Sequence, residues 1–189
     1  MEQILSMAEL SLDLRTLTDF PDYPDVDEVG ETFEENALLK AGAAAAYTGL
    51  PSIADDGGLV IDALDGQPGV KSHRFLGENT SFPDKMTRIL EMMRDVTGAK
   101  RSCRFHCCAA IVIPGQEPFI AKGICEGFVA DTMSGTNGFG YDPIFYLPEL
   151  HKHMAELSPE EKHRISHRGK ALTLAVEYLK TNYGQEPTT

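Results

Sequence analysis

Two adjacent aspartates, Asp55 and Asp56, stand between a short apolar run and two glycines in the stretch SIADDGGLVIDAL. Each carboxylate raises the cost of ionising the other, so the pair needs a cation or a set of hydrogen-bond donors. If the strand continued, the two side chains would face opposite ways and only one would serve a site. We expect Gly57 and Gly58 to end the strand and to allow close approach of backbone or ligand. Magnesium suits such an acidic strand end, and an Asp-Gly turn is the alternative.

Basic residues crowd the start of the last predicted helix, in the stretch ELSPEEKHRISHRGKAL. Ser166 is placed as the N-cap, and His167, Arg168 and Lys170 fall in the first turn, where the helix dipole disfavours cations. A ligand rich in oxygen acceptors would relieve the conflict, because the helix amides and the basic side chains would then face one partner. A solvated basic face is the alternative.

The stretch GTNGFGYDPIF carries three glycines and two aromatic residues. The glycines predict a pliable loop, and Phe139 and Tyr141 offer aromatic faces on which a base could stack. Such stacking contributes about 1–3 kcal/mol per base in nucleic-acid complexes. The alternative is that these aromatic side chains simply pack into the core.

Helical patterns flank these stretches on the sequence. Thr32 and Glu35 form a capping box and Gly49 ends the run, which predicts a helix between them. Apolar spacing of i, i+3, i+4 and i+7 within residues 81–96 predicts an amphipathic helix. A second capping signature at residues 158–161, and an apolar face that continues to Tyr183, predict the helical C-terminal part.

Strand patterns complete the expected fold. Short strands ending at Ala54 and spanning Leu59–Leu64 bracket the aspartates, and strands over residues 104–113 and 118–130 are joined through a Pro-Gly turn as a hairpin. This alternation of helices and strands predicts an α/β fold, a three-layer or elongated domain with a mixed sheet flanked by helices. We expect one domain over residues 1–183 and a flexible tail over residues 184–189.

Four cysteines follow no Cys-x-x-Cys pattern, and three of them lie in the stretch SCRFHCCAAIVIPG around the predicted strand over residues 104–113. Cys107 and Cys108 would point to opposite faces of that strand, so neither a disulfide framework nor a zinc site follows. We expect reduced, buried thiols.

The 189 residues carry a formal net charge of −12. A protein that binds DNA generally needs a basic face, so this balance argues against nucleic acid as a partner. No apolar run approaches the roughly 18 residues of a membrane span, and the first residues lack the basic region of a signal peptide. We therefore expect a soluble, cytoplasmic protein without a membrane partner.

Six blocks of this sequence, in order from about residue 28 to 180, resemble the inosine triphosphate pyrophosphatase family. The blocks are ETFEENALLKA, ADDGG, PGVKSHRF, GFGYDPIF, AELSPEEK and ISHRGKAL. Six ordered blocks are far more specific than any lone motif. The resemblance implies a homodimer of elongated two-lobed α/β subunits. It also implies Mg²⁺-dependent hydrolysis of the non-standard purine nucleotides ITP, dITP and XTP to monophosphate and pyrophosphate.

The resemblance also implies roles for individual residues. Asp56 would be the general base for the attacking water and a metal ligand, with Asp55 supporting it at the metal. Glu28 stands where the family has a further metal-binding acid; Glu35 is the alternative, but its capping box already accounts for it. Donors at the base would favour a 6-oxo group over the amine of adenine. The implied substrate contacts are Lys40 at the phosphates, Phe139, Gly140, Tyr141 and Asp142 around the nucleoside, and Lys162, His167 and Arg168 at the base, together with the backbone amide of Gly57, which is assigned to the substrate in general.

Two departures from the family pattern bear on activity. Gly57 replaces the usual serine, which leaves only a backbone amide there. The family's opening strand and Thr/Ser-x-x-Asn-x-x-Lys phosphate loop have no counterpart before the first helix, so we expect an N-terminally shortened fold with impaired turnover. A nucleotide-binding or structural homologue without efficient catalysis is the alternative. A magnesium-dependent phosphatase of other specificity is weaker, because the base-reading residues are present.

Overall fold

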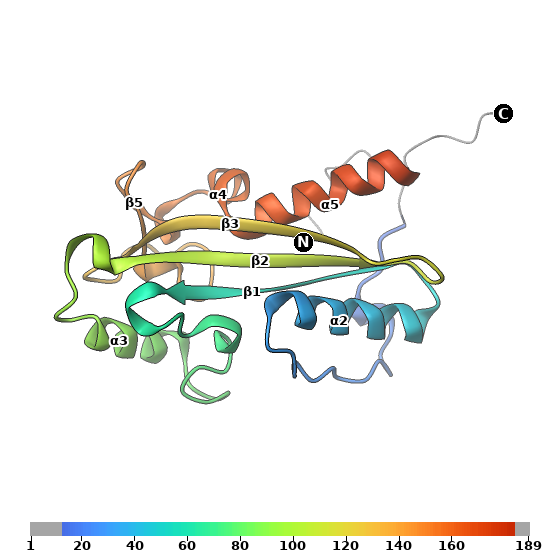
Figure 1. Cartoon of the computed structure of the whole chain (residues 1–189), viewed down its shortest axis with the longest axis horizontal. Coiled ribbons are helices and arrows are strands. Elements are labelled where there is room, and N and C mark those ends of the chain that lie inside the picture. The colour runs from blue at the N-terminus through green and yellow to red at the C-terminus, as the bar shows by residue number, and fades with distance from the viewer. Residues whose placement is uncertain (1–12, 184–189) are drawn as a thin grey trace. The chain divides into compact units, whose positions relative to one another are not determined.

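A five-stranded sheet with the order β1-β2-β3-β4-β5 runs through the computed structural model, which describes residues 13–183 (Figure 1). The predicted hairpin is confirmed, since β2 and β3 are neighbours. Strands β3 and β4 pair antiparallel, as do β4 and β5. The strands are β1 (Ser52–Ile61), β2 (Ser102–Val112), β3 (Phe119–Val129), β4 (Phe145–Leu147) and β5 (Lys152–His153).

The helices follow the capping signals of the sequence. Thr32 accepts from the backbone of Glu35 at the start of the first long helix, and Gly49 ends that helix at φ 70°. Ser158 caps the helix that begins at Pro159 in the same way. These caps satisfy backbone groups that the helix itself leaves unpaired. The helices are α2 (Phe33–Thr48), α3 (Phe82–Met92), α4 (Pro159–Ile165) and α5 (His167–Tyr183).

The described residues divide into two compact units, each built from separate stretches of chain. Unit 1 holds residues 13–56, Cys107–Gly123 and residues 168–183. Unit 2 holds Gly57–His106 and Ile124–His167. The two compact units and the mixture of helices and strands confirm the expected two-lobed α/β fold. The expected tail at residues 184–189 lies outside the described residues.

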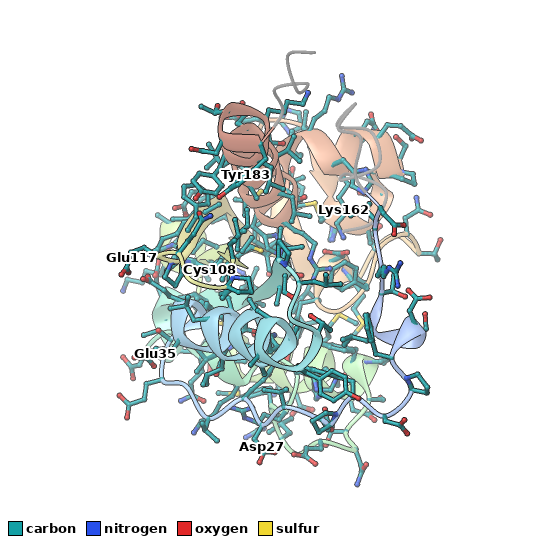
Figure 2. All side chains as sticks on the ribbon, turned by 90° about the vertical axis from the view of Figure 1, so that its right-hand side faces the viewer. Asp27, Glu35, Cys108, Glu117, Lys162 and Tyr183 are labelled. Carbon is teal, nitrogen blue, oxygen red and sulfur yellow. The ribbon has the colours of Figure 1, made fainter. Side chains whose placement is uncertain are left out.

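Unit 1 has three layers, and the alternation of side chains along β2 explains them. Cys107, Ala109 and Ile111 pack against α5, whereas Cys108 and Ala110 pack against Ala37 and Ala41 of α2. Figure 1 shows these two helices on opposite sides of the strands, and Figure 2 labels Cys108 next to the α2 ribbon. The small residues of α2 allow this close packing, and the expected buried thiols are confirmed.

Strand β1 corrects the prediction that Gly57 and Gly58 break the chain into two strands. It runs without interruption from Ser52 to Ile61, and residues 62–64 form a 3-10 helix instead of extending the strand. Pairing with β2 carries β1 through the glycines. A Cβ atom on Gly58 would lie 2.2 Å from Ser72 Oγ and 2.6 Å from Gly69 O, so the glycine permits close backbone approach within unit 2.

Unit 2 encloses its own apolar core, in which α3 packs through the residues that the helical spacing predicts. Met86, Ile89 and Met93 join Leu59 and Ile61 from β1 in this cluster. The buried Arg101 guanidinium donates to four backbone carbonyl oxygens, at the end of α3 and at the end of β3, at 2.7–2.9 Å. Since buried carbonyl groups need donors, Arg101 substitutes for missing backbone partners there.

Candidate functional site

Two carboxylates converge on one lysine in unit 1. Lys40 of α2 places Nζ 2.6 Å from Glu28 Oε1 and 3.3 Å from Asp56 Oδ1. The other oxygen of Asp56 accepts from Asn36 Nδ2 at 3.1 Å. Asn36 and Lys40 are four residues apart, so both reach Asp56 from one face of the helix. The side chains of this acidic cluster (Glu28, Asn36, Lys40 and Asp56) are buried or half-buried.

Burial sets the protonation behaviour of the acidic cluster. It raises the pKa of Asp56 above the ordinary aspartate value, although the charge of Lys40 and the bond from Asn36 oppose the shift. Burial lowers the pKa of Lys40, but the hydrogen bond to Glu28 and the charge of Asp56 outweigh that effect and leave the pKa raised. A carboxylate with a raised pKa beside a fixed cation is suited to accept a proton from water.

The acidic cluster offers two carboxylate ligands for a divalent cation, Glu28 and Asp56. Glu28 and Asp56 already meet at one positive charge, and magnesium often takes only one or two carboxylates and completes its shell with water and phosphate. Glu35, the alternative ligand, instead accepts from the backbone amides of Glu31 and Thr32 at 2.6 and 3.2 Å. Within residues 13–183, no group of three or more acidic, histidine or cysteine side chains forms a complete metal site.

Asp55, which the resemblance implies at the metal, does not join the acidic cluster, because consecutive side chains of a strand face opposite ways. Its Oδ2 accepts from Arg168 Nε at 2.7 Å and from Cys107 Sγ at 3.6 Å. Burial and the charge of Asp55 raise the pKa of the Cys107 thiol, which keeps the proton on sulfur. The two neighbouring aspartates therefore have different partners, both within unit 1.

A second arrangement, in unit 2, is built on Asp142, the first residue of a 3-10 helix (Asp142–Ile144). Its buried Oδ2 accepts from the Phe139 backbone amide at 2.8 Å and pairs with Lys162 of α4, which Figure 2 labels. The Lys162 ammonium also lies 4.3 Å from the centre of the Phe139 ring. A Cβ atom on Gly138 would lie 2.1 Å from Asp142 Oδ2, so this close packing needs glycine. We call Gly138, Phe139, Asp142 and Lys162 the loop cluster.

The two aromatic residues of this loop differ in exposure. Phe139 is 55% exposed, so its ring is open to a ligand, and Gly140 beside it has a φ of 65°. Tyr141 is buried, with its hydroxyl donating to Ser72 O at 2.8 Å and its ring edge-on to Phe82. The expectation that Tyr141 presents a face for stacking is therefore wrong, because its ring is part of the core.

His167 is buried in an aromatic stack in unit 2. Its ring lies 4.6 Å from that of Phe105, and Phe105 stacks in turn on Phe145 at 4.4 Å. Gly57 lies exposed on β1. Sequence reasoning missed Phe105, Asn36 and Cys107 as partners of predicted site residues. The spacing of Asn36 to Lys40 was the one local signal, since the other contacts join segments far apart in the chain.

An apolar groove of about 580 Å³ also lies in unit 1, between the segment around Leu14 and the C-terminal part of α5 at Leu179. None of the predicted site residues lines it. Its walls carry no pair of carboxylates, and we do not assign the chemistry to it.

Comparisons with known proteins agree with this geometry. A model of the Ham1 family matches residues 1–178. The dITP/XTP pyrophosphatase of Geobacillus kaustophilus is 50% identical over 182 residues, which cover 96% of this chain and 89% of that protein. A HAM1 protein structure from Coxiella burnetii shares 42% identity at a TM-score of 0.85, covering 95% of this chain and 94% of that one. The Ham1 protein structure of Staphylococcus aureus shares 44% identity at a TM-score of 0.81, covering 87% and 84%.

Proposed function

Because the chain belongs to the Ham1 family, we propose that it hydrolyses the non-standard purine nucleoside triphosphates ITP, dITP and XTP to a monophosphate and pyrophosphate. The 50% identity to a dITP/XTP pyrophosphatase over nearly the whole chain carries this proposal. The convergence of Glu28 and Asp56 on Lys40 supports it, because acids and a cation at one point suit chemistry on a phosphate chain.

We propose Asp56 as the general base that takes a proton from the attacking water. Its raised pKa and its bonds to Asn36 and Lys40 hold a carboxylate in one orientation while favouring proton uptake. Glu28 and Asp56 would hold Mg²⁺, which when bound supplies positive charge to the phosphate oxygens. Lys40 would then turn its ammonium toward the phosphates, since the ion takes over its role between the two acids.

As the resemblance to the family implies, we assign recognition of the base to Lys162 of the loop cluster in unit 2 and to Arg168 in unit 1. Asp142 fixes Lys162 beside Phe139, so a hydrogen-bond donor and an exposed ring stand together in unit 2. Both side chains carry hydrogen-bond donors, which suit the 6-oxo group of hypoxanthine or xanthine, whereas adenine presents an amine at that position. The backbone amides of Gly57 and Gly140 would contact the substrate, Tyr141 would act by holding the loop to the core, and His167 by its stack on Phe105.

The partner and location of the chain follow the same proposal. We propose a cytoplasmic homodimer, as the resemblance to the family implies. Across the described chain, no helix combines the length and apolar character that a membrane crossing requires.

Product analysis tests the proposed function. The chain is incubated with Mg²⁺ and each of ITP, dITP, XTP, GTP and ATP, and the nucleotide product and the released pyrophosphate or phosphate are quantified. We expect monophosphate and pyrophosphate in equal amounts, with the 6-oxo substrates ITP, dITP and XTP preferred to ATP. Release of single phosphates would instead indicate a phosphatase, and saturable nucleotide binding without any product would indicate a binding homologue.

A further inference from the structure

The position of Asp55 in unit 1 separates it from the metal chemistry of its neighbour. Asp56 faces Lys40 and Asn36, whereas Asp55 Oδ2 contacts Arg168 and Cys107 on the other side of β1. Successive side chains of a strand point to opposite faces. While β1 remains a strand, Asp55 therefore cannot reach the place where Glu28 and Asp56 meet at the Lys40 ammonium. Its charge therefore acts on Arg168.

The contact with Arg168 is an oriented, charge-assisted hydrogen bond. Nε donates to Oδ2 at 2.7 Å, and the carboxylate is only 10% exposed while the arginine side chain is 38% exposed. A bond at Nε fixes the plane of the guanidinium close to the point where it joins the flexible side-chain stem. The buried partner thus holds the more exposed one in a defined orientation.

The location of Arg168 on α5 gives this bond a second effect. Arg168 is the second residue of α5 (His167–Tyr183), where the positive end of the helix dipole disfavours a cation. The Asp55 carboxylate offsets that repulsion. The conflict seen in the sequence at the start of this helix is thus relieved, for Arg168, by a residue 113 positions earlier.

Cys107 fixes the carboxylate itself. Its thiol keeps its proton and donates to the same Oδ2 that accepts from Arg168. Cys107 belongs to the apolar cluster between β2 and α5, so its position is set by core packing. A chain of contacts therefore runs from the core of unit 1 through Asp55 to the guanidinium.

We propose that Asp55 is a positioning residue that sets the orientation in which Arg168 recognises the 6-oxo group of the purine, and that it is not a metal ligand. The inference rests on the proposed function, because it assigns Arg168 to the base. It predicts that loss of the Asp55 charge weakens base discrimination and substrate binding while the metal stays bound normally. If Asp55 were instead a metal ligand, loss of its charge would weaken metal binding and leave base discrimination unchanged.

The test compares Asp55→Asn, Arg168→Ala and the double variant in steady-state kinetics with ITP and ATP. We expect Asp55→Asn to lower the ITP/ATP ratio of kcat/KM by about 10- to 100-fold, mainly through KM for ITP, since misplacement of a binding group costs up to about 100-fold. The double variant should be no worse than Arg168→Ala alone, because both changes remove one interaction. Asp62→Asn is the matched control: its carboxylate pairs with Arg104 at 2.7 Å in unit 2 and should leave the ratio unchanged.

Two measurements without substrate complete the test. Mn²⁺ binding followed by electron paramagnetic resonance should be weakened in Glu28→Gln and unchanged in Asp55→Asn. The ¹⁵N resonance of Arg168 Nε–H, assigned with Arg168→Lys, should be protected from exchange in the wild-type chain and lose that protection in Asp55→Asn. If Asp55→Asn does not fold, Cys107→Ser and Cys107→Val take its place. Serine keeps a hydrogen-bond donor to Asp55 and valine has none, so only Cys107→Val should lower the ITP/ATP ratio of kcat/KM.

The outcomes separate this inference from the proposed function. A wild-type chain that hydrolyses no nucleotide, or treats ITP and ATP alike, contradicts base reading by Arg168 and overturns the proposal with it. A selective wild-type chain whose Asp55→Asn variant stays equally selective overturns the positioning role alone. Weakened Mn²⁺ binding in Asp55→Asn, or additive losses in the double variant, would also overturn it.

Discussion

The Asp56 carboxylate combines burial, a raised pKa and a fixed orientation, which together suit a general base. Asp56→Asn keeps the shape of the side chain but cannot accept the proton, so we expect kcat for ITP to fall by roughly 10²–10⁴, the usual contribution of such catalysis. Nucleotide affinity and the far-ultraviolet circular dichroism spectrum should stay close to wild type. Asp62→Asn, which removes an aspartate charge in unit 2, should retain full kcat. An Asp56→Asn chain with wild-type kcat would disprove the assignment.

The raised pKa of Asp56 also predicts how stability depends on pH in the absence of metal. The folded state binds this proton more tightly than the unfolded state, so stability falls as pH rises from about 3.9 through the folded-state pKa. Because asparagine carries no titrating proton, the stability of Asp56→Asn does not fall for this reason as pH rises. Calorimetry in a chelating buffer should therefore show the Tm of Asp56→Asn rising relative to wild type across that range and then levelling off. If the Tm difference between Asp56→Asn and the wild-type chain stays constant or shrinks as pH rises, burial does not raise the pKa of Asp56 as stated.

The residue types of the site could be predicted from the sequence, but their partners could not. Alternation along a strand predicts that Asp55 and Asp56 face apart, because that rule is local. The partners lie 16 and 113 positions away, at Lys40 and Arg168, and no local pattern encodes such distances. The burial of Tyr141 depends likewise on Ser72, 69 positions earlier.

Among the elements, helices were easier to predict than strands. The capping residues Thr32 and Ser158 act within one turn, so their sequence patterns and their structures agree. Strand β1 passes through Gly57 and Gly58 because its pairing with β2 outweighs the weak strand preference of glycine. That pairing joins segments about 50 residues apart and leaves no mark in the short stretch itself.

The loop before Asp142 supplies a prediction at this scale. Gly138 has a φ of 77°, and a Cβ atom there would lie 2.1 Å from Asp142 Oδ2 and 2.9 Å from Lys162 Nζ. Gly138→Ala should displace Lys162 and raise KM for ITP, by up to about 100-fold. The left-handed backbone alone should cost about 1–2 kcal/mol of stability when it carries a side chain, and the clash with Asp142 adds to that cost.

Gly115→Ala is the control for this backbone cost. Gly115 has a φ of 81°, and no atom of the described residues would lie within 4 Å of a Cβ atom placed on it, apart from its own chain neighbours. Both variants should lose stability in urea unfolding through the left-handed backbone, Gly138→Ala more than Gly115→Ala because of its additional clash, whereas only Gly138→Ala should change KM. An equal rise of KM in both would show that strain, and not the contact with Asp142 and Lys162, controls the loop.

For the molecule as a whole, interleaved chain segments explain why neither unit can be recognised as a stretch of sequence. Unit 1 is completed by α5, from the C-terminal part of the chain, and its core pairs Leu172 with Cys107 and Ile111 of β2. Unit 2 takes Leu59 and Phe145 from segments 86 positions apart. Composition predicts that enough apolar residues exist for a core, but their division between two cores follows from contacts between distant segments.

The net charge of −12 gives the last prediction, because the proposed substrate is a polyanion. The cations assigned to it are each paired with an acid: Lys40 with Glu28 and Asp56, Lys162 with Asp142, and Arg168 with Asp55. These pairs offset one another locally, so the field that an approaching triphosphate meets is set by the overall negative charge.

Salt should therefore accelerate the capture of ITP. Raising ionic strength from about 10 to 150 mM shortens the screening length from about 30 to 8 Å, and we expect kcat/KM for ITP to increase by roughly a factor of a few. The inhibition constant of inosine, which carries no phosphate, should stay unchanged in the same buffers and separates screening from effects on the fold. A fall of kcat/KM with added salt would mean that a local positive potential guides the substrate, and that the paired cations release their acids before the nucleotide arrives.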